Sequence, residues 1–180
     1  YSHIRDVLVE NLAIIDRAEQ MDGGLTGITT GFSKLDEMTS GMQKSDLIIL
    51  AARPAMGKTA FALSLARNAA VKGKASVMIF SLEMAKEQLT QRLLSMESKV
   101  DLQTLKTGRL ERRDWDDLNV ALDILSNSNI HIDDTAGISI MEMKSKCRRL
   151  KAEAGLDLVI IDYLQLMNPE GKADSRTQEI

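Results

Sequence analysis

Three consecutive residues, Gly57, Lys58 and Thr59, have the types and the spacing of a phosphate-binding loop. In such a loop a glycine leaves room for the phosphate, a lysine reaches the β and γ oxygens, and a hydroxyl can ligate Mg²⁺. The usual pattern asks for another glycine where this chain has Ala52. Alanine can serve there if its φ stays negative, so we interpret LAARPAMGKT as a phosphate loop. The candidate nucleotide-binding residues are Ala55, Met56, Gly57, Lys58, Thr59 and Ala60.

Two carboxylates follow apolar runs of strand length. Asp162 ends the run 158–161, and Glu83 follows the run 77–81. Ligands of open parallel sheets gather beyond the carboxyl ends of the strands, so we expect both carboxylates to converge on the phosphate loop. Asp162 would then join Thr59 at a metal site, and Glu83 would orient or deprotonate water beside the γ-phosphate. The alternatives are a strand-end turn residue for Asp162 and a solvated charge at the start of the next helix for Glu83.

Apolar runs of strand length alternate with helical patterns after residue 30. The predicted strands are 47–51, 77–80, 130–132 and 158–161. The predicted helices are 58–71, 86–96, 114–125 and a helix that ends at Ala154, opened by the capping box from Ser139 to Glu142. Such alternation predicts the α/β class, with a parallel sheet covered by helices on both faces.

The first segment, residues 1–21, is an amphipathic helix. Its apolar stripe consists of Ile4, Val7, Leu8, Leu12 and Ile15. A glycine-rich break follows, and we expect residues 22–30 to form a flexible connection to a domain over residues 31–180. The pattern leaves open whether the stripe packs on its own domain or on a neighbouring subunit.

Composition narrows the possible classes of protein. The 180 residues are 44% hydrophobic and carry a net charge of −3, which argues against a protein that holds nucleic acid by bulk positive charge, although a local basic groove would not show in the total. With Cys147 as the single cysteine and only two histidines, neither an internal disulfide nor a zinc cluster is expected. The sequence contains no run of about 18 apolar residues and no signal-peptide pattern, which indicates a cytoplasmic protein without a membrane span.

Four stretches together carry a family resemblance: TGFSKLDEMTSG, LAARPAMGKTAFAL, IFSLEM and IIDYLQLM. They resemble the bacterial replicative DNA helicases of the DnaB type. The resemblance implies a RecA-like P-loop motor that uses ATP and Mg²⁺, forms a hexameric ring and acts on single-stranded DNA. It also implies that Lys58 and Thr59 bind nucleotide and Mg²⁺, that Asp162 is the metal-site aspartate and that Glu83 is the catalytic base. The first helix resembles the family's linker helix, which docks on the adjacent motor. Primase and a helicase loader are the expected partners of the parent protein.

The same resemblance predicts that the chain is a fragment with an incomplete sheet. Family members carry an N-terminal domain, principal DNA-binding loops and an arginine finger that we do not find here. In RecA-like motors another strand lies between the phosphate-loop strand and the aspartate strand. We therefore expect no direct pairing of residues 47–51 with 158–162, and either pairing across molecules or an origin in a longer chain. An arginine finger contributes about 10³- to 10⁵-fold in rate, so weak hydrolysis is expected without it.

Other functions share parts of this pattern. A RadA-like or KaiC-like ATPase would have the loop and the aspartate strand but not ARPAMGKT or DYLQLM. A small-molecule P-loop kinase would need an arginine-rich lid, which the sequence lacks. A nucleotide-binding oligomerisation module without catalysis remains an alternative, which the presence of Glu83 disfavours. The basic run from Lys144 to Lys151 is interpreted as a solvated helix face rather than a DNA contact.

Overall fold

The computed structural model describes residues 3–19 and 25–167, and the chain divides into two compact units, Tyr1–Ile49 and Leu50–Ile180. The first unit contains the predicted N-terminal helix, α1, over Ile4–Glu19. All five residues of its apolar stripe are exposed. The predicted boundaries at residues 21 and 30 stay a prediction, because residues 20–24 lie outside the described residues.

A short helix that the sequence did not predict, α2 over Ser33–Thr39, belongs to the same unit. Asp36 anchors the segment before it, because its carboxylate accepts hydrogen bonds from both Thr29 and Thr30 hydroxyls at 2.6 Å. Burial raises the pKa of Asp36, but these bonds outweigh it and hold the pKa below its ordinary value. An isolated antiparallel bridge between Ile28 and Met42 closes the unit.

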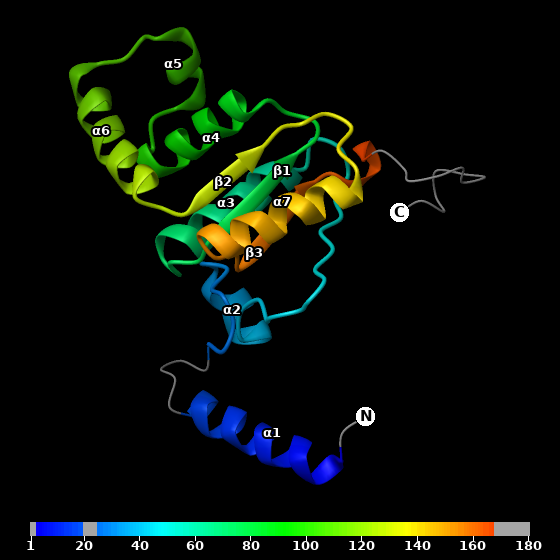
Figure 1. The fold of residues 1–180 in the computed structure, drawn as a ribbon. Helices are drawn as coiled ribbons and strands as arrows, with labels where there is room; N and C mark the ends of the chain where they lie inside the picture. Colours follow the sequence, from blue (N-terminus) through cyan, green and yellow to red (C-terminus); the bar gives the residue numbers. More distant parts are fainter. Residues whose placement is uncertain (1–2, 20–24, 168–180) are drawn as a thin grey trace. The chain divides into compact units, whose positions relative to one another are not determined.

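The second unit is built on a three-stranded parallel sheet with the strand order β2-β1-β3 (Figure 1). The strands are β1 (Val77–Ser81), β2 (Ile130–Asp133) and β3 (Leu158–Asp162). All five residues of β1 are buried, as expected for a central strand covered on both faces. The register places Ser81 opposite Asp162, so the carboxyl ends of β1 and β3 lie side by side. The predicted parallel α/β architecture is confirmed.

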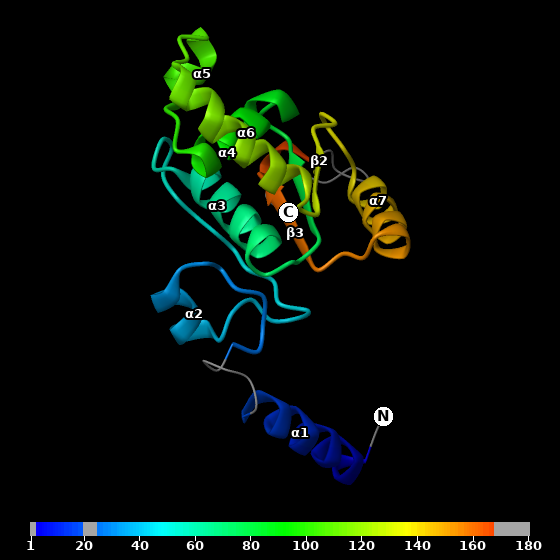
Figure 2. The same cartoon turned by 90° about the vertical axis from the view of Figure 1, so that its left-hand side faces the viewer.

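Helices cover both faces of this sheet. Figure 2 shows α7 on one face and α3 on the other. Alternate residues of β1 point to opposite faces of the sheet. On the α7 face, Met78 and Phe80 form a core cluster with Met143 of α7. The helices of this unit are α3 (Lys58–Val71), α4 (Lys86–Ser98), α5 (Leu102–Thr107), α6 (Arg112–Ser126) and α7 (Ile140–Glu153), followed by the 3-10 helix η2 (Leu164–Leu166). The predicted capping box at Ser139 is present before α7.

The strand predicted over residues 47–51 is not formed, which corrects the sequence interpretation. Its four large apolar side chains are 42% to 86% exposed. The physical reason is that a strand needs a hydrogen-bonding neighbour, and within the described residues β3 pairs only with β1. The described residues contain no strand pairing of residues 47–51, and their pairing across molecules stays a prediction.

No helix among the described residues has both the length and the apolar character needed to cross a membrane.

Candidate nucleotide-binding site

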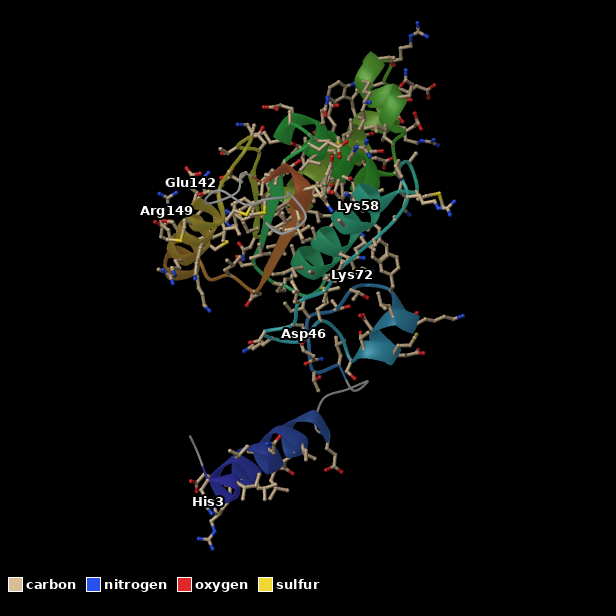
Figure 3. The ribbon with its side chains drawn as sticks, turned by 90° about the vertical axis from the view of Figure 1, so that its right-hand side faces the viewer. His3, Asp46, Lys58, Lys72, Glu142 and Arg149 are labelled. Atoms are coloured by element: carbon tan, nitrogen blue, oxygen red, sulfur yellow. The ribbon has the colours of Figure 1, made fainter. Side chains whose placement is uncertain are left out.

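The phosphate loop leads directly into helix α3, whose first residue is Lys58. Gly57 precedes the helix with φ 85°, a left-handed conformation that favours glycine. No side chain caps this helix end, and the first turn is closed by the bond from Phe61 N–H to the Gly57 carbonyl at 2.9 Å. The N–H groups at the start of α3 thus form a positive, donor-rich end that suits an anion. Figure 3 shows Lys58 at one end of α3 and Lys72 at the other.

The loop accommodates Ala52 at the position where the usual pattern has glycine, as expected. Ala52 keeps a negative φ, so alanine is tolerated at that position. The left-handed conformation falls instead on Ala55, with φ 64°, and on Gly57. A hydrogen bond from the Met56 N–H to the Arg53 carbonyl at 3.2 Å closes the turn that contains Ala55. Ala55, Met56 and Gly57 are all exposed, so the loop backbone is accessible to a ligand.

Two residues of the loop converge on Asp162, as the sequence predicted. The Lys58 ammonium lies 3.1 Å from Asp162 Oδ1, and the Thr59 hydroxyl donates to Oδ2 at 2.6 Å. Asp162 is buried, with 7% of its surface exposed. A buried carboxylate requires such partners, because its desolvation is otherwise costly. The arrangement joins the start of α3 to the end of β3.

Tyr163 is a member of this cluster that sequence reasoning missed. Its ring centroid lies 4.1 Å from the Lys58 ammonium, within the range of a cation–π contact. The lysine is therefore held by a carboxylate on one side and by an aromatic ring on another. The available signal was the position of Tyr163 directly after the strand aspartate in IIDY.

Glu83 lies in the turn after β1 and is exposed. The structure brings this turn to Asp162 through the backbone: Leu82 N–H donates to the Asp162 carbonyl at 2.8 Å. Within the described part of the chain, no side chain pairs with the Glu83 carboxylate. Lys58, Thr59 and Asp162 are thus joined by direct side-chain contacts, whereas Glu83 is joined to them through main-chain bonds.

The residues present fit a nucleotide and Mg²⁺. A Cβ built on Gly57 would meet no atom within 4 Å, so there is open space where a phosphate must approach. The described residues contain no cluster of three histidine, cysteine or acidic side chains around a common point. Mg²⁺ does not need such a cluster, because it is bound by one or two carboxylates together with phosphate oxygens and waters. Thr59 and Asp162 supply oxygen donors of that kind.

Thr59 and Asp162 also line a small pocket. Apart from those two residues its lining is apolar and comes from α3, α4, β1 and β3: Ala62, Leu63, Ile79, Leu89 and Ile160. The apolar lining gives the buried Asp162 carboxylate a low-dielectric surrounding, in which its contacts with Lys58 and Thr59 are stronger than they would be in water.

Comparison with known proteins gives a consistent result. Residues 27–180 match the family model of the DnaB-like helicase C terminal domain. The chain is 51% identical over 181 residues to the replicative DNA helicase DnaC of Bacillus subtilis, and 49% identical to the replicative DNA helicase DnaB of Geobacillus stearothermophilus. In both comparisons all of this chain is covered, but it spans only 40% of the relative.

Solved structures agree with the sequence comparisons. One solved ATPase domain superimposes with a TM-score of 0.89 at 39% identity, over 99% of this chain and 63% of that one. A DnaB-like replicative helicase, solved in a study of its interactions with primase, gives a TM-score of 0.85 at 39% identity, over 99% of this chain and 43% of that one. These matches confirm the predicted RecA-like fold.

Proposed function

Because the chain belongs to the family of DnaB-like helicase C-terminal domains, we propose that residues 27–180 form part of the ATP-hydrolysing motor of a replicative DNA helicase. The observation that carries this proposal is the meeting of Lys58 and Thr59, at the uncapped start of α3, with the buried Asp162. Helix N-terminus, ammonium, hydroxyl and carboxylate are the groups that a nucleoside triphosphate with its metal requires.

In this proposal the phosphate loop binds ATP through both main chain and side chains. The backbone N–H groups from Ala55 to Ala60 surround the phosphates, and the Lys58 ammonium leaves Asp162 to contact the β and γ oxygens. Tyr163 keeps the lysine beside the loop during this exchange. Thr59 and Asp162 would hold Mg²⁺, which neutralises charge on the phosphate oxygens when it is bound.

Glu83 is the proposed catalytic base. Its carboxylate is exposed on the turn joined to Asp162, where it can accept a proton from water or orient the water toward the γ-phosphate. A general base contributes about 10²- to 10⁴-fold to a rate. Glu83 is suited to this role because it is not paired with Lys58, unlike Asp162.

The partners of the whole protein follow from the family. We propose that it forms a hexameric ring on single-stranded DNA in the cytoplasm, with primase and a helicase loader as protein partners. The structural neighbour studied with primase supports the primase proposal. The exposed apolar stripe of α1 supports docking of this helix on a neighbouring motor. Deleting residues 1–20 should then lower the assembly mass measured by light scattering, and an unchanged mass would rule out that docking.

The decisive experiment compares two variants of the complete protein that contains residues 1–180. Lys58→Ala should weaken binding of a fluorescent ATP analogue, whereas Glu83→Gln should bind it nearly as well as the unmodified protein and hydrolyse ATP about 100-fold more slowly. Full turnover by Glu83→Gln would remove Glu83 from the base role. Absence of nucleotide binding in the unmodified protein would refute the motor function. Binding without turnover would favour the non-catalytic oligomerisation module.

A further inference from the structure

The turn that carries Glu83 is held on both sides of that residue. On the side before it, the Leu82 N–H donates to the Asp162 carbonyl at 2.8 Å. On the side after it, the Met84 carbonyl accepts a hydrogen bond from the Ser81 hydroxyl at 2.6 Å. Glu83 is therefore an exposed side chain on a backbone whose two flanking residues are each bound to the end of the sheet.

Ser81 is well placed to hold this turn. It is the last residue of β1, it is only 3% exposed, and it lies opposite Asp162 in the strand register. A hydrogen bond at such a buried position competes little with water and is stronger than one at the surface. Loss of this bond would leave the carbonyl of the half-buried Met84 without the Ser81 hydroxyl as a donor and would free the turn to change shape.

We propose that Ser81 is a positioning residue for Glu83: its hydroxyl fixes the turn so that the Glu83 carboxylate stands at a constant place relative to Asp162. The inference rests on the proposed role of Glu83 as the base. A displacement of about 1 Å at a catalytic group can lower a rate by about 10²-fold, so a bond that fixes the turn acts on turnover. Because Ser81 is only 3% exposed and its hydroxyl donates to the Met84 carbonyl, we expect Ser81 to affect turnover rather than nucleotide binding.

The chain offers a matched control at the opposite end of the same strand. Ser76 directly precedes β1, is also 3% exposed, and donates its hydroxyl to the Gly155 carbonyl at 2.8 Å. Ser76 is as buried as Ser81 and also donates its hydroxyl to a main-chain carbonyl, but it lies at the amino edge of the sheet, away from the phosphate loop. Ser76→Ala and Ser81→Ala should therefore cost similar stability and differ in catalysis.

The experiment measures ATP hydrolysis and binding of a fluorescent ADP analogue in the complete protein. Ser81→Ala should lower kcat by about 5- to 10-fold with KM and Kd unchanged within about twofold. Ser76→Ala should lower Tm by a similar amount and leave kcat unchanged. Ser81→Cys keeps a side chain of similar shape and replaces a strong donor with a weak one, so it should give an intermediate kcat. This variant tests the inference if Ser81→Ala folds poorly.

A double-mutant cycle separates positioning from general damage. If Ser81 acts through Glu83, Ser81→Ala should lower kcat no further in a Glu83→Gln background. A normal kcat for Ser81→Ala, or the same fold decrease in both backgrounds, would overturn the inference while the proposed function stands. Equal turnover by Glu83→Gln and the unmodified protein would instead contradict the base role itself, so the two failures are distinguishable.

Discussion

Two aspartates end the two outer strands of the sheet, and each is paired with a lysine. Asp162 ends β3 and pairs with Lys58, whereas Asp133 ends β2 and pairs with Lys146. The exposed fractions of the side chains are nearly the same: 29% and 10% for the first lysine and aspartate, 30% and 15% for the second. Each pair also has a threonine hydroxyl beside it, from Thr59 and from Thr135. The side-chain types of the lysine, aspartate and threonine, and the burial of the lysine and aspartate, therefore do not distinguish the two sites.

The backbone distinguishes them. Lys58 is the first residue of α3 and follows a glycine in the left-handed conformation, so it lies at a helix end whose N–H groups have no side-chain cap. Lys146 lies within α7, at the seventh position of a helix whose start is already capped by Ser139. Only the first pair can therefore offer N–H groups and an ammonium to the same anion. In the proposed function, the position of Lys58 along its helix, rather than its carboxylate partner, therefore suits it to bind phosphate.

The largest expected effect separates the two lysines. Lys58→Met should weaken nucleotide binding by about 10- to 100-fold, because a charged donor to the phosphates is lost. Lys146→Met should change the affinity by less than about twofold. Both affinities can be measured by titration with a fluorescent nucleotide. Equal losses in the two variants would show that general electrostatics, rather than the loop, determines binding.

The two aspartates should differ in turnover. Asp162→Asn keeps the size of the side chain but removes the charge that accepts from Thr59 and would hold Mg²⁺ in the proposed function, so kcat should fall by about 10- to 100-fold. Asp133→Asn should leave kcat unchanged within about twofold, since Asp133 contacts neither the loop nor Glu83 in any hydrogen bond or ion pair found among the described residues. Steady-state hydrolysis at saturating ATP and Mg²⁺ tests this. A marked decrease in kcat for Asp133→Asn would show that the active site includes the end of β2.

The third prediction concerns the glycine that begins α3. Gly57→Ala forces a Cβ into the left-handed region, which costs about 1–2 kcal/mol and lowers Tm by about 2–4 °C for each kcal/mol. Gly108→Ala is the matched control, because Gly108 has φ 69° and equally open surroundings at the end of α5. Both variants should lose similar stability in thermal melting, but only Gly57→Ala should also bind nucleotide more weakly. Unchanged binding would show that the phosphate does not approach this glycine.

The smallest expected effect is the pH dependence of the second pair. Burial raises the pKa of Asp133, but the Lys146 ammonium and hydrogen bonds from Thr135 and Lys146 outweigh it, so the pKa lies below its ordinary value of 3.8. A carboxyl group with a lowered folded-state pKa contributes stability above the unfolded pKa and loses it as the pH falls through the folded one. Asp133→Asn should therefore lower Tm at pH 7, and this difference should shrink below pH 3.8. A difference in Tm that is constant with pH would contradict the ionic origin.

Most of the second unit was predictable because its signals are local. The helix over residues 58–71 has the predicted bounds, and Ser139 caps α7 as its spacing to Glu142 indicated. The three strands of the sheet match apolar runs of similar length. The short helices α2 and α5 were missed, because six or seven residues carry too little periodicity to be recognised.

The sequence by itself determined the chemistry of the site: a glycine, lysine and threonine at the start of a helix, and an aspartate and a glutamate after apolar strands. The tertiary structure alone decided which groups meet. It joined Asp162 to Lys58 and Thr59, set Tyr163 against the lysine, and tied the Glu83 turn to Ser81 and the Asp162 carbonyl. The physical reason is the range of the interactions. A helix satisfies its hydrogen bonds within a few residues, so its sequence is sufficient to predict it. A strand depends on a partner distant in the chain, which is why residues 47–51 have the pattern of a strand and form none.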